Sequence, residues 1–200
     1  MSFAMRYEEM QQLLQKSLKP SRYEHSLGVA ETAVFLAKRF GVDEEQARVA
    51  GLLHDCAREF RNEDLISEAE KRLIVVEPLE RRMPLLLHAY VGSRLVAEKY
   101  GVNDNAIEQA IWRHTVGGPQ MTALDKIIWF ADMIEPHRDY PEVEMLRELA
   151  KTPGTEALVE PITPLSKYPA VWPGDEDYFN NDIALYYGLA EYSVTEYVNH

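Results

Sequence analysis

Apolar residues recur every three or four positions along most of the chain, which is the spacing of an amphipathic α-helix. Leu27, Ala30, Val34 and Ala37 follow this spacing early in the chain. No segment shows the alternation of apolar and polar residues that indicates a β-strand. The pattern therefore predicts an all-α fold, with a first helix ending before Pro20 and further helices over about 21–40, 43–57, 62–71, 88–100, 104–115, 122–135, 141–151 and 183–198.

Capping residues place the ends of several helices. A serine, threonine or aspartate followed three residues later by an acid or a glutamine is typical of an N-terminal capping box. Gly41 and Gly101 follow the last apolar position of a helix and indicate its end. Pro78 and Pro84 are expected to break helical structure between residues 72 and 84. The predicted boxes are Ser21 with Glu24, Asp43 with Gln46, and Thr122 with Asp125.

The length of 200 residues suits one hydrophobic core, so we predict a single domain over residues 1–200. The composition changes near residue 160, where four prolines fall within thirteen residues. We interpret residues 160–180 as a long loop, which is either a lid over a site or a tolerated surface segment. Residues 183–198 are predicted to form a C-terminal helix with a tyrosine-rich face.

Composition narrows the classes of function. The chain carries 21 Lys and Arg against 33 Asp and Glu, a net charge of −12, which disfavours nucleic acid as a partner. The single cysteine, Cys56, excludes an intrachain disulfide and a multi-cysteine zinc site. No apolar run approaches the roughly 18 residues of a membrane span, and the N-terminus is too polar for a signal peptide. We expect a soluble cytoplasmic protein.

Ionisable residues lie within strongly apolar helical sequence at three places. His54 and Asp55 follow Gly51-Leu52-Leu53, His88 follows three leucines, and Asp132 follows an apolar run of five residues. A buried carboxylate without a partner costs several kcal/mol, about the cost of a broken buried ion pair. Any one of these residues alone is more often a satisfied core residue. Together with His25 and His114 they indicate a shared metal site, because one cation supplies the missing partner for all of them.

The donor atoms restrict the metal. Imidazole and carboxylate without thiolate suit iron, manganese, cobalt, nickel or zinc and disfavour copper(I) and iron–sulfur clusters. Six candidate ligands exceed the needs of one closed tetrahedral site. Neighbouring residues on a helix point about 100° apart, so His54 and Asp55 can share a site only across a groove between helices, or if Asp55 bridges two ions. Either arrangement leaves open positions and favours catalysis.

A lone histidine, a His-Asp pair and a distant aspartate resemble the signature of the HD-domain metal-dependent phosphohydrolases. The surrounding sequence is similar to that of the bacterial YqeK-type symmetrical diadenosine tetraphosphate hydrolases over residues 6–151. The similarity is carried by Arg22-Tyr23-Glu24-His25-Ser26-Leu27-Gly28, Ala50-Gly51-Leu52-Leu53-His54-Asp55, Leu86-Leu87-His88-Ala89, His114-Thr115 before Gly117, and Asp125-Lys126-Ile127-Ile128 running to Ala131-Asp132-Met133-Ile134-Glu135-Pro136.

This resemblance implies a single HD-domain helical bundle that hydrolyses diadenosine tetraphosphate to two ADP by means of a metal-bound water. It implies iron, as one or two ions, with manganese, cobalt, nickel or zinc as other candidates. A homodimer is left open. Asp55 and Arg58 would be catalytic. The implied first-site ligands are His25, His54, Asp55 and Asp132; His88 and His114 would hold a second metal or contact phosphate; and Arg22, Arg58, Thr115 and Arg138, with those two histidines, would bind substrate.

The sequence departs from the family pattern at a few positions. Arg58 replaces a common lysine, Gly118 replaces a residue that is often charged, and His137 replaces a usual asparagine. The inserted segment 160–180 separates the C-terminal helix from the rest of the resemblance. Cys56 is expected to be a packed side chain rather than a nucleophile.

Two other functions fit the same ligand set. One is a different HD phosphohydrolase, such as a nucleotide 5′-phosphatase or a guanosine alarmone hydrolase, which would differ in the shape of its pocket. The other is a non-catalytic nucleotide or metal sensor that keeps the fold. The complete ligand set disfavours the sensor, because a domain that no longer catalyses tends to lose its ligands first.

Overall fold

The computed structural model describes residues 3–118 and 120–151. These ranges contain helices and no strand, which confirms the all-α prediction, and none of the helices is long and apolar enough to cross a membrane. The predicted loop 160–180 and helix 183–198 lie outside the described residues, and the single domain over 1–200 stays a prediction. The helices are α1 (Tyr7–Ser17), α2 (Pro20–Phe40), α3 (Glu44–Leu53), α4 (Leu65–Lys71), α5 (Pro78–Arg82), α6 (Leu87–Tyr100), α7 (Asn105–Arg113), α8 (Ala123–Ile134) and α9 (Val143–Lys151), with 3₁₀ turns η1 (Cys56–Glu59), η2 (Asn62–Asp64) and η3 (Pro84–Leu86).

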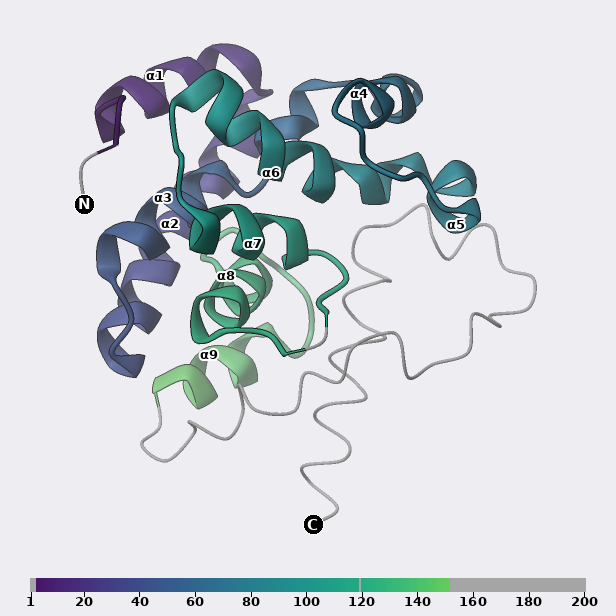
Figure 1. The fold of residues 1–200 in the computed structure, drawn as a ribbon. Helices are drawn as coiled ribbons and strands as arrows, with labels where there is room; N and C mark the ends of the chain where they lie inside the picture. The colour runs from purple at the N-terminus through teal and green to yellow at the C-terminus, as the bar shows by residue number, and fades with distance from the viewer. Residues whose placement is uncertain (1–2, 119, 152–200) are drawn as a thin grey trace.

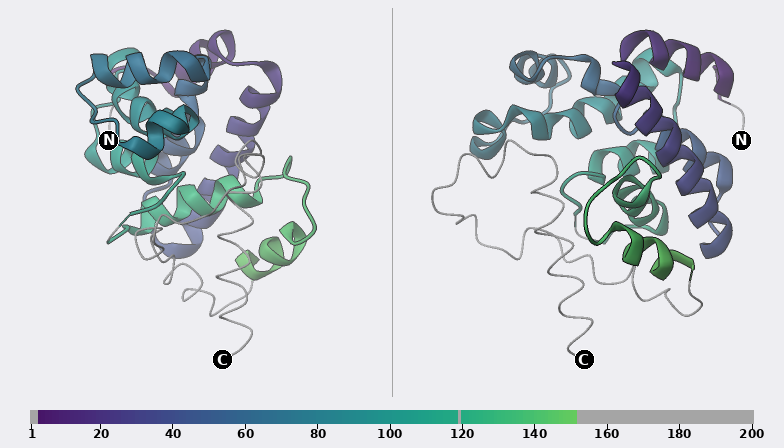
Figure 2. Two further views of the ribbon diagram at one scale, coloured as in Figure 1. Left: turned by 90° about the vertical axis from the view of Figure 1, so that its right-hand side faces the viewer. Right: turned by 180° about the vertical axis from the view of Figure 1, so that it is seen from behind.

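Five helices form the centre of the bundle. α2 packs against α3 and α8, α6 packs against α7, and α7 also contacts α3 and α8 (Figure 1). α1 lies across the top of the bundle and α9 below it, beside α8 (Figure 2). Leu52, Val91, Ile111 and Ile128 from four of the central helices are fully buried in one apolar core. This core fixes the relative positions of the helices that carry the predicted ligands.

The helix ends agree with most of the predicted caps. Gly41 and Gly101 end α2 and α6 with φ of 67° and 65°, in the left-handed region that glycine adopts at little cost. Asp43 accepts hydrogen bonds from the backbone N–H groups at the start of α3. Thr122 and Asp125 form the predicted box at the start of α8. The caps that follow from local sequence therefore hold in these four places.

Two predicted caps are wrong. α2 begins at Pro20 and not after Ser21, because proline has no N–H to leave unpaired in a first turn and its φ already suits a helix. Gln46 does not close a box with Asp43; its side-chain amide donates to Asp104 at 3.0 Å and so joins α3 to the start of α7. The proline thus decides where α2 begins, and a contact between two helices takes the Gln46 side chain away from the predicted cap.

Pro78 and Pro84 interrupt the helical structure as expected, since α4 ends at Lys71 and α5 ends at Arg82, before Pro84. Each opens a short helix, α5 and η3, at a first-turn position. α5 also carries a capping box in which the Glu80 carboxylate accepts from the Glu77 N–H at 2.7 Å. Proline in a first helical turn removes only an N–H that the helix does not use.

Close packing of α2 on α3 depends on Gly51. A Cβ atom at Gly51 would lie 2.8 Å from Ala30 Cα and 3.1 Å from Ala30 N. The two backbones therefore approach more closely than any side chain permits. Since His54 follows α3 directly and His25 lies on α2, this approach also sets the separation of two predicted ligands.

We expect Gly51→Ala to destabilise the protein by about 1–3 kcal/mol, because the new methyl group overlaps backbone that cannot move aside. Without that overlap, Gly→Ala in a helix stabilises by about 0.5–1 kcal/mol. The matched control is Gly92→Ala on α6, where the nearest atom to the added Cβ is 3.4 Å away. Chemical unfolding of the two variants measures the difference, and equal stabilities would contradict it.

Candidate metal centre

The structure gathers all six predicted ligands at one place. They come from five segments: α2, the end of α3, α6, the end of α7, and α8. None is more than 7% exposed, and three overlapping groups each place their donor atoms within 4.8 Å of one another. The six residues, called the HD cluster below, are His25, His54, Asp55, His88, His114 and Asp132.

The chain leaves the α-helix between His54 and Asp55, which lets both side chains face the cluster. α3 ends at Leu53, and His54 retains helical angles as its C-cap. Asp55 has φ −101° and ψ 15°, in the sparsely occupied bridge region, before η1 begins. The expected divergence of about 100° assumed an unbroken helix, so it does not apply here.

Backbone carbonyls fix the tautomers of three histidines. Nδ1 lies 2.8 Å from Gly51 O in His54, 2.5 Å from Leu85 O in His88 and 2.7 Å from Ile111 O in His114. A carbonyl oxygen can only accept, so each Nδ1 carries the hydrogen and each Nε2 presents a lone pair to the cluster. In metal sites, a hydrogen bond from the outer ring nitrogen to a carbonyl oxygen holds the ligating histidine in its orientation.

The lone pairs face one another at short range. His88 Nε2 lies 3.1 Å from His114 Nε2, and the Thr115 hydroxyl lies 3.2–3.3 Å from both. His25 Nε2 lies 3.2 Å from His54 Nε2, which carries a lone pair. The facing lone pairs of His88 and His114 need a positive charge between or beside them. The donor set therefore fits a divalent cation, as the sequence predicted.

The HD cluster has two halves: one contains His88 and His114, and the other contains His25, His54 and Asp132. Asp55 presents one carboxylate oxygen to each half. Oδ1 lies 3.2 Å from His88 Nε2 and 3.8 Å from His114 Nε2. Oδ2 lies 3.7 Å from His54 Nε2 and 3.9 Å from His25 Nε2. Asp132 Oδ1 adds to the second half, 3.0 Å from His25 Nε2. The arrangement is that of a carboxylate shared by two adjacent groups of imidazoles.

Burial and local charge set the protonation states. Burial lowers the pKa of His54 to about 3 and also lowers the pKa of His88, so both are neutral at pH 7. Burial alone would raise the pKa of Asp132, but the Arg138 charge and a hydrogen bond with His25 hold it well below its usual range. The pKa of Asp55 is lowered in the same way, by its histidine neighbours and against burial. Neutral imidazole and ionised carboxylate are the forms that bind metals.

His25 differs because it contacts two carboxylates. Burial disfavours its charged form, but hydrogen bonds with Asp132 and Glu135 outweigh burial and raise the pKa of His25 to about 9. Glu135 is 1% exposed, and its Oε1 lies 3.1 Å from His25 Nδ1. No role for Glu135 was predicted from the sequence. Its position three residues after Asp132, at the end of the same apolar run, was the available signal.

Predicted substrate-binding residues surround the HD cluster. Arg22 Nη1 donates to Asp55 Oδ2 at 3.0 Å, and Arg138 Nη2 donates to Asp132 Oδ1 at 2.5 Å. Arg58 lies in η1. Burial is the main cause of the lowered pKa of His88, and the positive charge of Arg58 lowers this pKa further. Thr115 contacts both histidines of its half of the cluster. The structure thus brings three arginines to a site in a chain of net charge −12.

The segment after α8 borders the cluster and is held from behind. Arg147 on α9 donates to the carbonyl oxygens of Ile134, Glu135 and Arg138 at 2.9, 2.6 and 2.9 Å. A hollow of about 580 Å³ lies against this segment and is lined by both Arg138 and Arg147. His137, which replaces an asparagine usual in the resembling family, has an exposed side chain. Its Nδ1 atom lies 2.9 Å from Glu135 Oε2.

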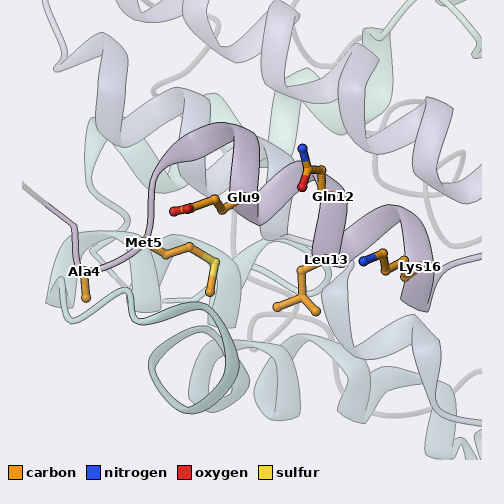
Figure 3. Close-up of a pocket in the computed structure, with 6 residues that line it drawn as sticks. All are labelled: Ala4, Met5, Glu9, Gln12, Leu13 and Lys16. Atoms are coloured by element: carbon orange, nitrogen blue, oxygen red, sulfur yellow. The ribbon is translucent and has the colours of Figure 1, made fainter.

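Three further features of the described residues provide no donor atom to the cluster. A hollow of about 420 Å³ along α1 contains none of its residues (Figure 3). Gly118 lies against the Arg113 side chain. Cys56 is buried with its sulfur 3.7 Å from Gly92 O, and burial raises the pKa of its thiol, which agrees with the expected packing role.

Comparisons with known proteins agree with this geometry. The HD domain family model matches residues 22–137. The chain is 40% identical to the symmetrical bis(5′-nucleosyl)-tetraphosphatase of Bacillus subtilis over 79% of this chain and 84% of that protein. It is 41% identical to the protein of the same name from Halalkalibacterium halodurans over 74% and 79% of the two chains.

A solved structure is also similar. It is described as a predicted HD superfamily hydrolase involved in NAD metabolism from Clostridium acetobutylicum, with a TM-score of 0.73 and 38% identity. The match covers 80% of this chain and 85% of that one. The residues, the fold and the relatives lead to one conclusion: this chain belongs to the HD-domain family and, within it, to the family of the symmetrical bis(5′-nucleosyl)-tetraphosphatases.

Proposed function

We propose that this protein is a metal-dependent hydrolase that cleaves diadenosine tetraphosphate symmetrically into two ADP molecules. The observation that carries the proposal is the HD cluster, in which imidazole lone pairs and two ionised carboxylates converge in a buried space bordered by arginines. The named activity of the Bacillus subtilis relative, at 40% identity, supplies the substrate class.

The proposed metal ligands form two sets that share Asp55. His25, His54, Asp55 and Asp132 would hold the first ion, and Asp55, His88 and His114 would hold a second ion or contact phosphate. We propose iron, while manganese, cobalt, nickel and zinc accept the same nitrogen and oxygen donors. When bound, such a cation makes a water more acidic and offsets negative charge on phosphate.

The arginines of this chain would bind and orient the substrate. Arg22 and Arg138 have side chains that are 29% and 18% exposed, so each reaches both a ligand carboxylate and the solvent from which a polyphosphate arrives. Arg58, on the turn after Asp55, and Arg138 would offset charge on the phosphate oxygens as the bond breaks. Three positive side chains offset the charges of Asp55, Asp132 and Glu135, so the site does not share the strong negative charge of the whole chain.

A symmetrical cut places the reacting phosphorus in the middle of the tetraphosphate. Water attacks one of the two inner phosphorus atoms, and the bond from that atom to the oxygen bridging the inner pair breaks. The leaving ADP retains the bridging oxygen, and the attacked half takes up the oxygen of water. The cluster residues and arginines must therefore hold the middle of a long ligand, with a nucleoside on either side.

Two other functions share the ligand set. A different HD phosphohydrolase, such as a nucleotide 5′-phosphatase or a guanosine alarmone hydrolase, would release phosphate or pyrophosphate from other nucleotides. A non-catalytic nucleotide or metal sensor would bind without turnover. The products of the reaction distinguish the three functions.

We expect the metal-loaded protein to convert diadenosine tetraphosphate into ADP alone, measured by chromatography of the products. AMP with ATP would indicate an asymmetrical cut and would contradict the proposal. Release of phosphate or pyrophosphate from other nucleotides, without ADP from the tetraphosphate, would favour the second function. Absence of turnover by protein with full metal content would favour the sensor.

Asp55→Ala is expected to abolish metal retention and turnover together, because it removes a donor from both halves of the cluster. We expect metal affinity to fall by more than about 100-fold, the upper range for loss of a mere second-shell partner. Glu8→Ala removes an exposed carboxylate in α1 and is the matched control. Metal analysis and product formation test this expectation. Full metal content with an unchanged rate in Asp55→Ala would refute the assignment of Asp55.

The proton on His25 makes metal binding depend on pH. In the metal-free protein the pKa of His25 is raised from 6.5 to about 9. Its contribution to stability is therefore complete below pH 6.5 and is lost as the pH rises through 9. The same proton must leave before a cation takes Nε2, so metal affinity should rise about tenfold per pH unit up to that pKa.

Calorimetry in buffers of different protonation enthalpy measures this proton. At about pH 7.5 we expect the unmodified protein to release about one proton more per ion bound than the control, His25→Ala. At about pH 10 His25 is largely neutral, so the two proteins should release nearly equal numbers of protons. The carboxylate neighbours of His25 move the loss of its proton upward from the ordinary pKa of 6.5. Equal release by the two proteins at about pH 7.5 would contradict this shift.

A further inference from the structure

Both oxygens of the Glu135 carboxylate have a hydrogen-bond partner, one in His25 and the other in His137. Oε1 lies 3.1 Å from His25 Nδ1. Oε2 accepts the backbone N–H of His137 at 2.8 Å and lies 2.9 Å from His137 Nδ1. A carboxylate accepts only, so the hydrogen in the first contact is on His25 Nδ1. The Nε2 atom of His25 is then turned toward Asp132 Oδ1, 3.0 Å away.

Helix α2 leaves room for this carboxylate at Gly28. Gly28 is buried and lies three residues after His25, so both occupy one face of α2. A Cβ atom at Gly28 would lie 2.4 Å from Glu135 Oε2 and 3.3 Å from His137 Nδ1. A side chain of any size would therefore displace the carboxylate or the turn that carries it.

The backbone around Glu135 is fixed independently of His25. Arg147 donates to the carbonyl oxygens on both sides of this turn, at Ile134 and Arg138, and to that of Glu135 itself. The Tyr140 hydroxyl donates to Met133 O at 2.9 Å near the end of α8. The carboxylate is therefore held on a supported turn and can orient a neighbouring side chain.

We propose that Glu135 is a positioning residue of the metal centre, which holds the His25 ring with Nε2 toward the other ligands, and that Gly28 is required because it leaves the space that Glu135 occupies. The inference rests on the proposed metal site. Neither Glu135 nor Gly28 is among the proposed ligands, so the inference gives each of them a new role in the metal centre. Glu135 acts through His25, as second-shell carboxylates act on ligating histidines.

A purely structural role for Glu135 makes a different prediction. If Glu135 served only to join the end of α8 to α2, its loss would lower stability and leave the affinity of the folded protein for metal unchanged. The tests below therefore measure metal binding and its spectrum as well as unfolding.

The full-length metal-free chain is titrated with Co²⁺ in competition with a coloured chelator, and the absorption of the bound Co²⁺ is recorded. We expect Glu135→Ala to weaken Co²⁺ binding by about 10–100-fold and to change the Co²⁺ bands, because the His25 ring is no longer held. Glu135→Gln retains a carbonyl oxygen that can accept from His25 Nδ1, so it should recover part of the affinity. Glu68→Ala on α4, which removes another poorly exposed carboxylate, is the matched control and should bind Co²⁺ as the unmodified protein does.

Gly28 is tested by a double-mutant cycle. Gly28→Ala removes no polar group, yet it should weaken Co²⁺ binding in the same direction as Glu135→Ala. In Glu135→Ala the space is already empty, so adding Gly28→Ala should cause no further loss. If Gly28→Ala alone does not fold, the double variant should, because the overlap is gone. Additive losses in the cycle would overturn the role of Gly28.

Unchanged Co²⁺ affinity and spectrum in Glu135→Ala would overturn the positioning role, as would a Glu135→Gln variant that is as weak as Glu135→Ala. The unmodified protein separates this failure from failure of the proposed function. If it binds Co²⁺ and forms ADP from diadenosine tetraphosphate while Glu135→Ala binds equally well, only the present inference is wrong. If the unmodified protein binds no divalent ion, the metal-site proposal fails first.

Discussion

The structure depends on the convergence of imidazole nitrogens and carboxylate oxygens in one buried space. Four histidine Nε2 atoms and the oxygens of two aspartates meet among five helical segments, and three of the imidazoles are turned inward by hydrogen bonds to backbone carbonyls. So many acceptors without a positive charge would repel one another and oppose folding. Arg22, Arg138 and the proton on His25 provide that charge in the metal-free protein. The helix packing therefore creates a site whose electrostatics favour a cation.

Arg22 and Arg138 would connect the proposed cation site with the proposed binding of substrate. Each donates to a carboxylate oxygen that also lies among the proposed ligand atoms, Asp55 Oδ2 and Asp132 Oδ1. Cation binding and arginine pairing consequently compete for the same oxygens. An arginine whose carboxylate is taken by a metal has more of its charge available to a phosphate group. In this way the loading of the metal and the attraction of an anionic substrate favour each other.

The fold and the six cluster residues could be predicted because their signals are local. Helical spacing places the elements, and an ionisable group inside apolar sequence stands out at His54, Asp55 and Asp132. Glu135 could not be assigned in this way, since a glutamate before a proline at a helix end resembles an exposed terminus, while its partner His25 lies 110 residues away. The cap at Ser21 failed for a related reason: the preceding proline, and not the polar pattern, decided where α2 starts. Contacts between distant segments thus limit what the sequence shows.

The ligands are widely separated along the chain, from His25 on α2 to Asp132 on α8. An ion held by both would act as a cross-link that closes a loop of roughly one hundred residues, and such closure restricts the unfolded chain more than the folded one. Binding to the native state alone also makes folding depend on the concentration of free metal. The lifetime of this protein against unfolding and proteolysis would then depend on the supply of that ion. A shortage of the metal would therefore lower the amount of folded protein as well as its activity.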